Sequence, residues 1–183
     1  VHVYKDKKGQ WWFLGIYSNK YEDRDEEILS EKSHKDYIKW LKKTGFQPVI
    51  TAYHQPRMPL GFWSAVFAKY ENRPKVLQKI VDYAYRKFAF AKVQKVFYLN
   101  GFTYVLAKFL PGKEKIAKKL SENSDLGMSH GFIVKKISDS IIDSYRTFEM
   151  SVLKRKRAAN LLTRAMTLLK DGLGMTAKSK KLA

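Results

Sequence analysis

One serine in this chain stands in a pattern that is typical of a nucleophile. Residues 127–131, Gly-Met-Ser-His-Gly, satisfy the G-x-S-x-G pattern that surrounds the reactive serine of many hydrolases. A serine hydroxyl attacks a carbonyl carbon efficiently only when a base takes its proton, and histidine is the usual base. Ser129 is therefore the first candidate catalytic residue, and its partners must be sought elsewhere in the chain.

The pattern does not extend to the nucleophile elbow of an α/β-hydrolase. That elbow needs an apolar strand before the serine, a helix directly after it and a histidine late in the chain. Here the preceding residues 121–126 are mostly polar turn formers, the following residues alternate as in a strand, and no histidine occurs after His130. We reject the elbow and keep Ser129 as a candidate nucleophile.

The chain contains four histidines that could serve as the base. His2 lies at the start, and His34 lies on the apolar face of an expected helix, which favours a structural histidine. His130 is next to Ser129 on an expected strand, where neighbouring side chains point to opposite faces. His54 ends a strand and precedes a proline-containing turn, so it is the best candidate for the base.

A third group must orient the imidazole and stabilise its charged form. If residues 132–148 form a hairpin centred on Asp139, Glu149 lies directly opposite Ser129. This register is an assumption, because a slip of one residue turns Glu149 to the other face of the sheet. Asp125 and Asp143 are weaker candidates for the acid, since both lie in expected turns.

The candidate residues are expected on strands or at their ends. Five segments are rich in aromatic and β-branched residues and are expected to form strands: 10–18, 48–54, 61–70, 127–134 and 147–153. Two more such runs flank Asn100-Gly101, and an Asn-Gly pair in this setting is the strongest short signal of a hairpin.

Four other segments show the apolar spacing of helices. They are 31–43, with Ser30 or Ser33 as N-cap and Gly45 as stop; 74–87, with Asn72 as N-cap and Pro74 in its first turn; 113–122; and 158–170. Together the segments predict one mixed α+β domain over 1–172, with a curled antiparallel or mixed sheet flanked by helices. Residues 173–183 are expected to be a basic flexible tail.

The composition restricts partners and cofactors. The 183 residues include 36 Lys and Arg against 17 Asp and Glu, and the net charge of +19 predicts attraction to nucleic acid or to acidic proteins. No cysteine is present, which excludes disulfides and thiolate zinc sites. The acidic run 21–27 lacks the spacing of a calcium loop, and no apolar run is long enough to span a membrane. We therefore expect no thiolate zinc site, no calcium loop and no membrane contact.

Three motifs taken together resemble the prohead protease family of tailed phages, whose members mature the capsid. They are a histidine followed by Pro-Leu-Gly at 54–61, Gly-x-Ser-x-Gly-Phe at 127–132, and Glu-x-Ser-Val at 149–152 with an Ala-Asn pair at 159–160. The likeness covers roughly residues 10–160. The proline that usually follows the Ala-Asn pair is Leu161 here, and residues 70–122 are unusually rich in lysine and aromatic residues.

The resemblance implies a small, curled, barrel-like and mostly antiparallel sheet, similar to the herpesvirus assemblin protease. It implies a serine endopeptidase with His54, Ser129 and Glu149 as its triad and with no cofactor. Gly127 and Gly131 would let backbone N–H groups near the serine bind the oxyanion. The implied substrates are scaffold and major capsid proteins inside an immature phage head, the prohead, in the host cytoplasm.

Other interpretations stay open at the level of sequence. Ser129 and its glycines could serve tight packing alone. The chain could also be a catalytically silent basic domain that lines a capsid or binds nucleic acid through four exposed aromatic residues, Trp11, Trp12, Phe97 and Tyr104. A homo-oligomer and non-specific contact with nucleic acid remain open as well. Because maturation proteases commonly trim themselves, we expect a longer encoded protein that is shortened near residues 176–183.

Overall fold

Eight strands within the described residues form the frame of the fold. The computed structural model describes residues 1–21 and 27–157. Its strands are β1 His2–Lys5, β2 Trp11–Asn19, β3 Ile28–Leu29, β4 Val49–Ala52, β5 Ala91–Leu99, β6 Phe102–Phe109, β7 Leu126–Ser138 and β8 Ile141–Lys154. The strands predicted over 10–18, over 127–134 and over 147–153 are confirmed, and the last two extend further than predicted. The Asn100-Gly101 hairpin is also confirmed, since this pair joins β5 to β6 with both φ angles positive.

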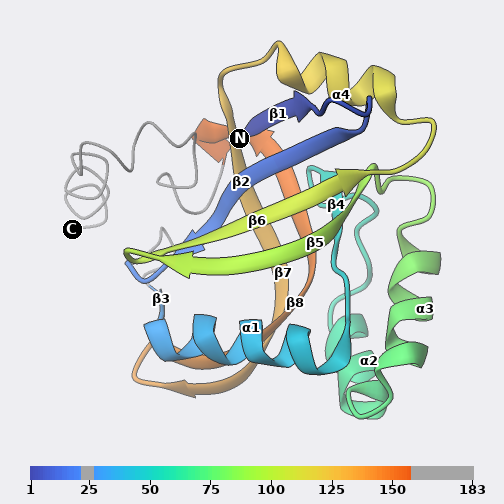
Figure 1. Ribbon diagram of the computed structural model, residues 1–183. Coiled ribbons are helices and arrows are strands. Elements are labelled where there is room, and N and C mark those ends of the chain that lie inside the picture. Colours follow the sequence, from blue (N-terminus) through green and yellow to red (C-terminus); the bar gives the residue numbers. More distant parts are fainter. Residues whose placement is uncertain (22–26, 158–183) are drawn as a thin grey trace.

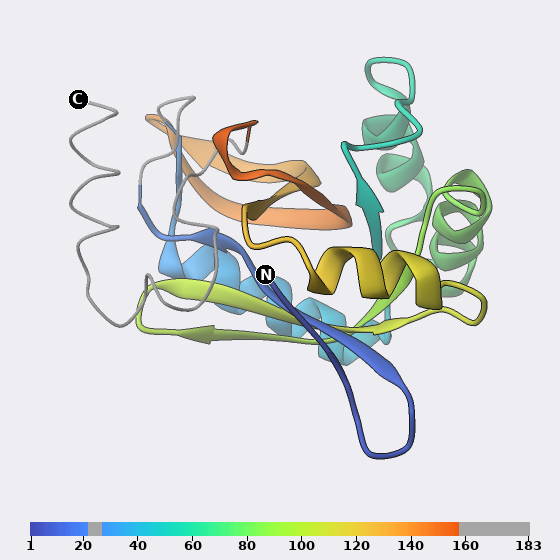
Figure 2. The same ribbon diagram turned by 90° about the horizontal axis from the view of Figure 1, so that it is seen from above.

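The strands make one strongly curled sheet (Figure 1). Its order is β1-β2-β6-β5-β4-β8-β3, and β7 pairs with β8. Most neighbours are antiparallel, but β4 and β3 both run parallel to β8. Seen from above, β5 and β6 lie across the interior from β7 and β8, with β4 between the two sides (Figure 2). The mixed α+β class is as predicted, whereas the described strands do not close into a barrel, so the barrel-like form is not confirmed.

Helix α1 (Glu31–Thr44) begins and ends at the signals that the sequence provides. The Ser30 hydroxyl oxygen accepts a hydrogen bond from the Ser33 N–H at 3.1 Å, which makes Ser30 the N-cap. Gly45 adopts the left-handed conformation and donates its N–H to the carbonyl of Leu41. On the inner face the Tyr37 hydroxyl donates to the backbone carbonyl of a β8 residue at 2.8 Å, so the helix is fixed to the sheet.

Residues 61–70 form helix α2 (Phe62–Tyr70) and not the predicted strand. Four apolar side chains at helical spacing pack against one cluster: Trp63, Val66, Phe67 and Tyr70. Aromatic and β-branched content favours strands, but this spacing buries the apolar side chains only if the segment is helical. The spacing therefore outweighs the local preference, and the strand prediction was wrong.

The remaining described helices are α3 (Pro74–Ala84) and α4 (Glu114–Ser121), and both were predicted. In α3 the N-cap is Arg73 and not Asn72, and the helix ends before the predicted residue 87. No helix within residues 1–21 and 27–157 is long and apolar enough to cross a bilayer. The predicted helix at 158–170, the predicted tail and most of the acidic run lie outside the described residues.

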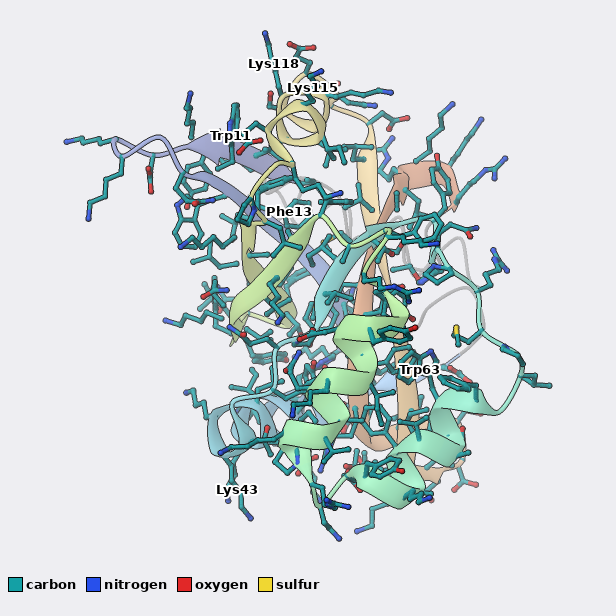
Figure 3. The ribbon with its side chains drawn as sticks, turned by 90° about the vertical axis from the view of Figure 1, so that its right-hand side faces the viewer. Trp11, Phe13, Lys43, Trp63, Lys115 and Lys118 are labelled. Atoms are coloured by element: carbon teal, nitrogen blue, oxygen red, sulfur yellow. The ribbon has the colours of Figure 1, made fainter. Side chains whose placement is uncertain are left out.

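Two large apolar clusters hold most of these elements together, and a third, small cluster contains Ile16, Phe102 and Tyr104. The inner cluster lies between the two sides of the curled sheet and includes Phe13, Tyr17, Tyr37, Met128 and Tyr145. The outer cluster joins β4 and β8 to α2 and α3 and includes Trp63, Phe67, Leu77, Val81, Tyr85 and Phe148. Figure 3 shows Phe13 among the strands and Trp63 beside the two helices. The sheet is thus covered by apolar side chains on both faces.

His34 is a buried structural residue, as its position on an apolar helix face predicts. Its side chain is fully buried, and its Nε2 lies 3.0 Å from the carbonyl oxygen of Asn19. Because a carbonyl can only accept, Nε2 carries the proton, and Nδ1 accepts from the Tyr145 hydroxyl at 2.8 Å. Burial lowers the pKa of His34 from 6.5 to about 4. Both ring nitrogens are therefore occupied, and His34 is not available as a base.

The buried His34 predicts that the protein loses stability as the pH falls from 6.5 toward 4. In this range the unfolded chain binds a proton on the imidazole and the folded chain does not, so acid favours unfolding. The full effect is about 3 kcal/mol. His34→Gln keeps one donor and one acceptor but does not titrate. Its unfolding free energy in urea should therefore fall less between neutral pH and mildly acidic pH than that of the wild type, and an equal fall would contradict the assignment.

Candidate active site

His54 and Glu149 are joined directly by hydrogen bonds. The His54 Nδ1 lies 2.8 and 3.0 Å from the two carboxylate oxygens of Glu149. Glu149 lies in β8, and His54 follows β4, which runs parallel to β8 with Val49 beside Glu149 and Thr51 beside Ser151. The pairing of these two strands therefore brings together two residues that are far apart in the sequence.

A left-handed turn at the end of β4 positions the His54 ring. The predicted strand reaches residue 54, but β4 ends at Ala52, and both Tyr53 and His54 have positive φ angles of 53° and 54°. Such angles are uncommon for residues with a side chain and need support from the surroundings. The support comes from Ser151, whose fully buried hydroxyl oxygen accepts the His54 backbone N–H at 2.7 Å.

Glu149 is held in an apolar environment. Its side chain is 1% exposed, and burial raises its pKa above the ordinary value, although hydrogen bonds from His54 and from the Thr51 hydroxyl at 3.4 Å act in the opposite direction. Burial, and then the negative charge of Glu149, raises the pKa of Tyr85, a member of the outer cluster. With its Nδ1–H directed at the carboxylate, the neutral His54 ring has its lone pair on Nε2.

Ser129 lies on β7, opposite the serine that anchors His54. The ladder pairs Ser129 with Ser151, and it pairs Gly131 with Glu149. The predicted direct pairing of Ser129 with Glu149 was therefore wrong by two residues. One residue of the difference comes from the two-residue turn at Asp139-Ser140, and the other comes from a β-bulge at Phe148. A shift of two preserves the face, so Glu149 is a diagonal neighbour of Ser129.

Ser129 and His54 are not hydrogen-bonded to each other in the described part of the chain. Directly paired residues on adjacent strands have Cβ atoms about 5 Å apart, so Ser129 lies next to Ser151 and close to the turn that Ser151 anchors. The structure thus joins two of the three predicted residues and positions the third on the neighbouring strand.

His130 faces the inner cluster, away from this site. Its Nδ1 is 2.7 Å from the Thr147 hydroxyl, and its ring stacks on Phe132 with centroids 4.3 Å apart. Burial lowers its pKa well below the ordinary value. These contacts agree with the expectation that neighbouring strand residues point to opposite faces, and they exclude His130 as a direct partner of Ser129.

The two glycines that flank Ser129 lie in the β7 strand. Gly127 is buried, and Gly131 is packed against the ring of Phe148. A Cβ atom added at Gly131 would lie 3.0 Å from that ring, so any side chain there would displace it. Because Phe148 stacks on Trp63 with centroids 4.6 Å apart, Gly131 allows the outer cluster to approach the buried Glu149.

The weaker candidates for the acid have other partners. Asp143 accepts a hydrogen bond from the Ser30 hydroxyl at 2.8 Å, next to the start of α1. Asp125 forms an ion pair with Arg155, with Nε 3.5 Å from the carboxylate oxygen. The described residues contain no cluster of three or more His, Cys, Asp or Glu side chains that could hold a metal ion.

The sequence did not identify Ser151 and Thr51 as supports of the site. The spacing of two between Glu149 and Ser151 on a strand was the available signal, because it puts both side chains on the same face. The role of Ser151 as the acceptor for the His54 N–H depends on a turn that comes from another part of the chain. No local pattern predicts that contact.

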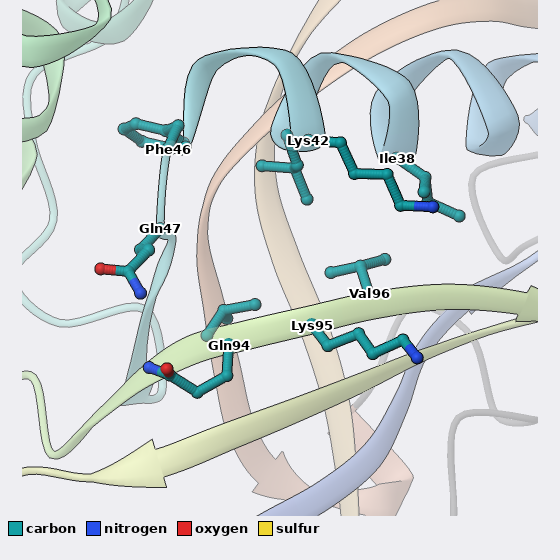
Figure 4. A pocket seen from close by; sticks show the side chains of 10 residues that line it. Ile38, Lys42, Phe46, Gln47, Gln94, Lys95 and Val96 are labelled. Carbon is teal, nitrogen blue, oxygen red and sulfur yellow. The ribbon is translucent and has the colours of Figure 1, made fainter.

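A hollow lies between α1 and β5, apart from the His54–Glu149 pair (Figure 4). It is lined by Ile38, Leu41, Lys42, Gly45, Phe46, Gln47, Val93, Gln94, Lys95 and Val96. This lining contains no carboxylate, imidazole or hydroxyl group. It offers neither a nucleophile with a base nor an acid, and we do not consider it a candidate active site.

The four aromatic residues proposed for base stacking are not freely exposed. Tyr104 is buried and stacks on Phe97 with centroids 4.8 Å apart. Trp12 donates its indole N–H to Asp6 at 2.8 Å, and Trp11 is half-buried against the inner cluster. An arrangement of open aromatic faces for stacked bases is therefore not present at these positions.

Comparison of the chain with models of protein families, with curated proteins and with solved structures gives no match. Any assignment of function therefore depends on the geometry of the site and on the three sequence motifs.

The anchoring role of Ser151 leads to a test. Ser151→Ala leaves the buried His54 N–H without its acceptor, which should lower the free energy of unfolding by about 1–3 kcal/mol. The NMR resonances of the His54 ring should also shift. Ser144→Ala is a matched control, because Ser144 lies on the same strand as Ser151 but away from the site, and its hydroxyl donates to Asp36 of α1. Equal losses of stability and an unchanged His54 ring would contradict the role of Ser151.

Proposed function

We propose that the protein is a serine endopeptidase in which Ser129 is the nucleophile, His54 the base and Glu149 the residue that orients the base. The main support is the pairing of a buried carboxylate with a half-exposed imidazole: the side chain of Glu149 is 1% exposed and that of His54 is 32% exposed. His34 differs from His54 in this respect, since it is buried and both of its ring nitrogens form hydrogen bonds. In His54 only Nδ1 has a hydrogen-bond partner among the described residues, so Nε2 is available for chemistry.

The proposed reaction follows from this tautomer. Nε2 of His54 takes the proton of the Ser129 hydroxyl while the oxygen forms a bond to the carbonyl carbon of the scissile peptide. The imidazolium then gives the proton to the leaving amine as the C–N bond breaks and an acyl-enzyme forms. A water molecule repeats the sequence with His54 again as base and releases the acid. Glu149 stabilises the imidazolium, because its charge acts in a poorly solvated environment.

This mechanism requires Ser129 and His54 to approach each other. Catalytic hydrogen bonds are often long before substrate binds and shorten in the complex. Ser129 is half-buried on a strand next to the His54 turn, so rotation of its side chain and a small movement of the turn are the changes required. The backbone N–H groups of Tyr53 and His54 are bonded to Val152 and Ser151 of β8, so most of this movement falls on the His54 side chain.

The proposed oxyanion donors are backbone N–H groups of β7. Among the described strands β7 pairs only with β8. In an antiparallel pair, alternate residues direct their N–H groups away from the partner strand, so alternate N–H groups along this part of β7 point away from β8. Gly127 and Gly131 carry no side chains that would obstruct a carbonyl oxygen.

The substrates and the location are proposed from the resemblance. They are scaffold and major capsid proteins inside a prohead, in the host cytoplasm, and the net charge of +19 favours acidic partners. The mechanism needs no cofactor. The barrel-like fold of the family is part of the same proposal, and it is supported by the curl that brings β5 and β6 across the interior from β7 and β8.

Ser129→Ala should abolish covalent labelling by a fluorophosphonate and cleavage of a co-expressed scaffold protein. The loss of a triad nucleophile lowers the rate on the order of 10⁴-fold or more. The melting temperature should change little, because Ser129 is half-buried on a strand with one neighbour. Mass spectrometry of the labelled wild type should locate the reagent on the peptide that contains residues 127–131.

His130→Gln serves as the control for this experiment, since its side chain faces the inner cluster and its labelling should persist. A label on a different serine would show that Ser129 is not the nucleophile. If neither labelling nor cleavage occurs in any form of the protein, the alternative of a catalytically silent basic domain is favoured.

Glu149→Gln should lower activity while its stability relative to the wild type rises toward neutral pH. The amide can donate to Nδ1 and so favour the wrong tautomer, and the equivalent change in serine protease triads lowers the rate about 10⁴-fold. Burial raises the pKa of Glu149, so its ionised form opposes folding once the pH exceeds the ordinary value of 4.5. The unfolding free energy of the variant relative to the wild type should therefore increase between that pH and neutrality. A variant that keeps its activity would remove Glu149 from the mechanism.

A further inference from the structure

An apolar groove lies between the loop that follows His54 and helices α2 and α3. It is lined by Met58, Phe62, Val76, Lys79, Ile80, Tyr83, Ala84 and Arg86. Its volume of about 490 Å³ is in the range of ligand-binding pockets. Six of these residues are apolar or aromatic, and the other two are cations, so the lining combines apolar area with positive charge.

The groove is physically connected to the candidate active site. Four of its residues pack against the outer cluster: Met58, Phe62, Ile80 and Ala84. The same cluster contains Tyr85, whose pKa responds to the charge of Glu149. Met58 is also only four residues from His54, and four residues of chain span at most about 14 Å. An extended peptide of a few residues can therefore reach from His54 to the groove.

Large apolar side chains are exposed around this region. Leu60, in the loop between His54 and α2, is fully exposed, and Tyr83 is 67% exposed. Tyr53, next to His54, is 39% exposed. Apolar side chains that remain in solvent beside a groove indicate a binding surface.

The cations at the groove are available to an acidic ligand. Arg86 follows α3 and lies over the ring of Tyr83, with its guanidinium carbon 3.9 Å from the centroid and one N–H donated to the Tyr83 carbonyl at 2.8 Å. Lys79 lies on α3 itself, and neither cation is paired with a carboxylate among the described residues. The nearby acid Asp82 is already paired with Lys92 at 2.9 Å. The groove therefore has an uncompensated positive charge at an apolar surface.

We propose that this groove binds apolar side chains of an acidic peptide segment and is a specificity subsite for the substrate. The leucine-sized side chains would contact Ile80 and Tyr83, while carboxylates of the same segment would pair with Lys79 and Arg86. The mainly apolar lining favours a peptide over nucleic acid, whose phosphates would meet only two cations. The subsite role depends on the proposed protease function, whereas binding of the peptide does not.

Binding can be measured on the whole chain carrying Ser129→Ala, so that no cleavage interferes. The probe is a fluorescein-labelled peptide of about twelve residues, with two leucines four positions apart among glutamates and alanines. Its anisotropy should report binding that weakens about tenfold on addition of Tyr83→Ser, because an aromatic contact of this size contributes about one order of magnitude in affinity. Leu99→Ser is the matched control, since Leu99 is 52% exposed at the distant β5–β6 turn, and it should have no effect.

Reversing charges in the protein and in the peptide tests whether the bound segment must be acidic. Lys79→Glu should weaken the glutamate peptide and strengthen a peptide in which lysines replace the glutamates. Replacement of both leucines by asparagine should remove binding to every form of the protein. The proposal is overturned by equal effects of Tyr83→Ser and Leu99→Ser, by no binding at about 1 mM peptide, or by a short single-stranded DNA that competes as strongly as the peptide.

The subsite role is tested separately with Ser129 intact. In a peptide that extends the probe by a cleavable segment, Tyr83→Ser should raise KM and leave kcat nearly unchanged, because the groove binds ground state and transition state alike. Peptide binding without cleavage would refute the protease function and leave a docking groove. Cleavage that is insensitive to Tyr83→Ser would refute the subsite and leave the protease function intact.

Discussion

The parallel pairing of β4 with β8 is the contact on which the candidate site depends. Four residue pairs join these strands, from Val49 beside Glu149 to Ala52 beside Val152. Because the strands run in the same direction, the chain that leaves β4 must turn back to reach Glu149, and the left-handed residues Tyr53 and His54 make that turn. β4 also pairs with β5, so the strand that delivers the histidine is the one that connects the two sides of the curled sheet.

A charged cluster fixes the helices around this pairing. The Arg146 side chain on β8 is only 12% exposed and bonds to Asp36 of α1 at 2.7 Å and to Glu71, which follows α2, at 3.1 Å. Its guanidinium also lies over the ring of Trp40. The two carboxylates compensate the charge of the little-exposed Arg146, and through them α1 and the end of α2 are held against the strand that carries the buried acid. The walls of the site and of the apolar groove therefore share one support.

Local signals in the sequence predicted helix ends and turns. The features that the sequence did not predict depend on contacts between distant segments. The Gly45 stop and the Asn100-Gly101 turn each act over a few residues and were predicted correctly, and the N-cap Ser30 is one of the two serines that the sequence left open. Residues 61–70 were misread because their composition favours a strand while burial against the outer cluster favours a helix. The three candidate triad residues were chosen from motifs and spacing, but the register between Ser129 and Glu149 was not predicted correctly. It depends on a two-residue turn and on a bulge at Phe148, and the bulge has no signature in the sequence.

That bulge divides the long β7–β8 hairpin into two parts with different tolerance to change. On one side of Phe148 the strands carry Ser129, Gly131 and Glu149 in a fixed register with β4. On the other side the strands run out to an exposed turn at Asp139-Ser140, and the ladder there is irregular in two further places. Directly after the turn, however, β8 pairs with β3 at Ile141 and Ile142, and the side chains of Ile142 and Tyr145 are fully buried. A residue gained or lost inside this strand would therefore shift buried side chains. Only the exposed turn at Asp139-Ser140 is free to change in length, for example by an inserted tag, while the buried carboxylate keeps its neighbours.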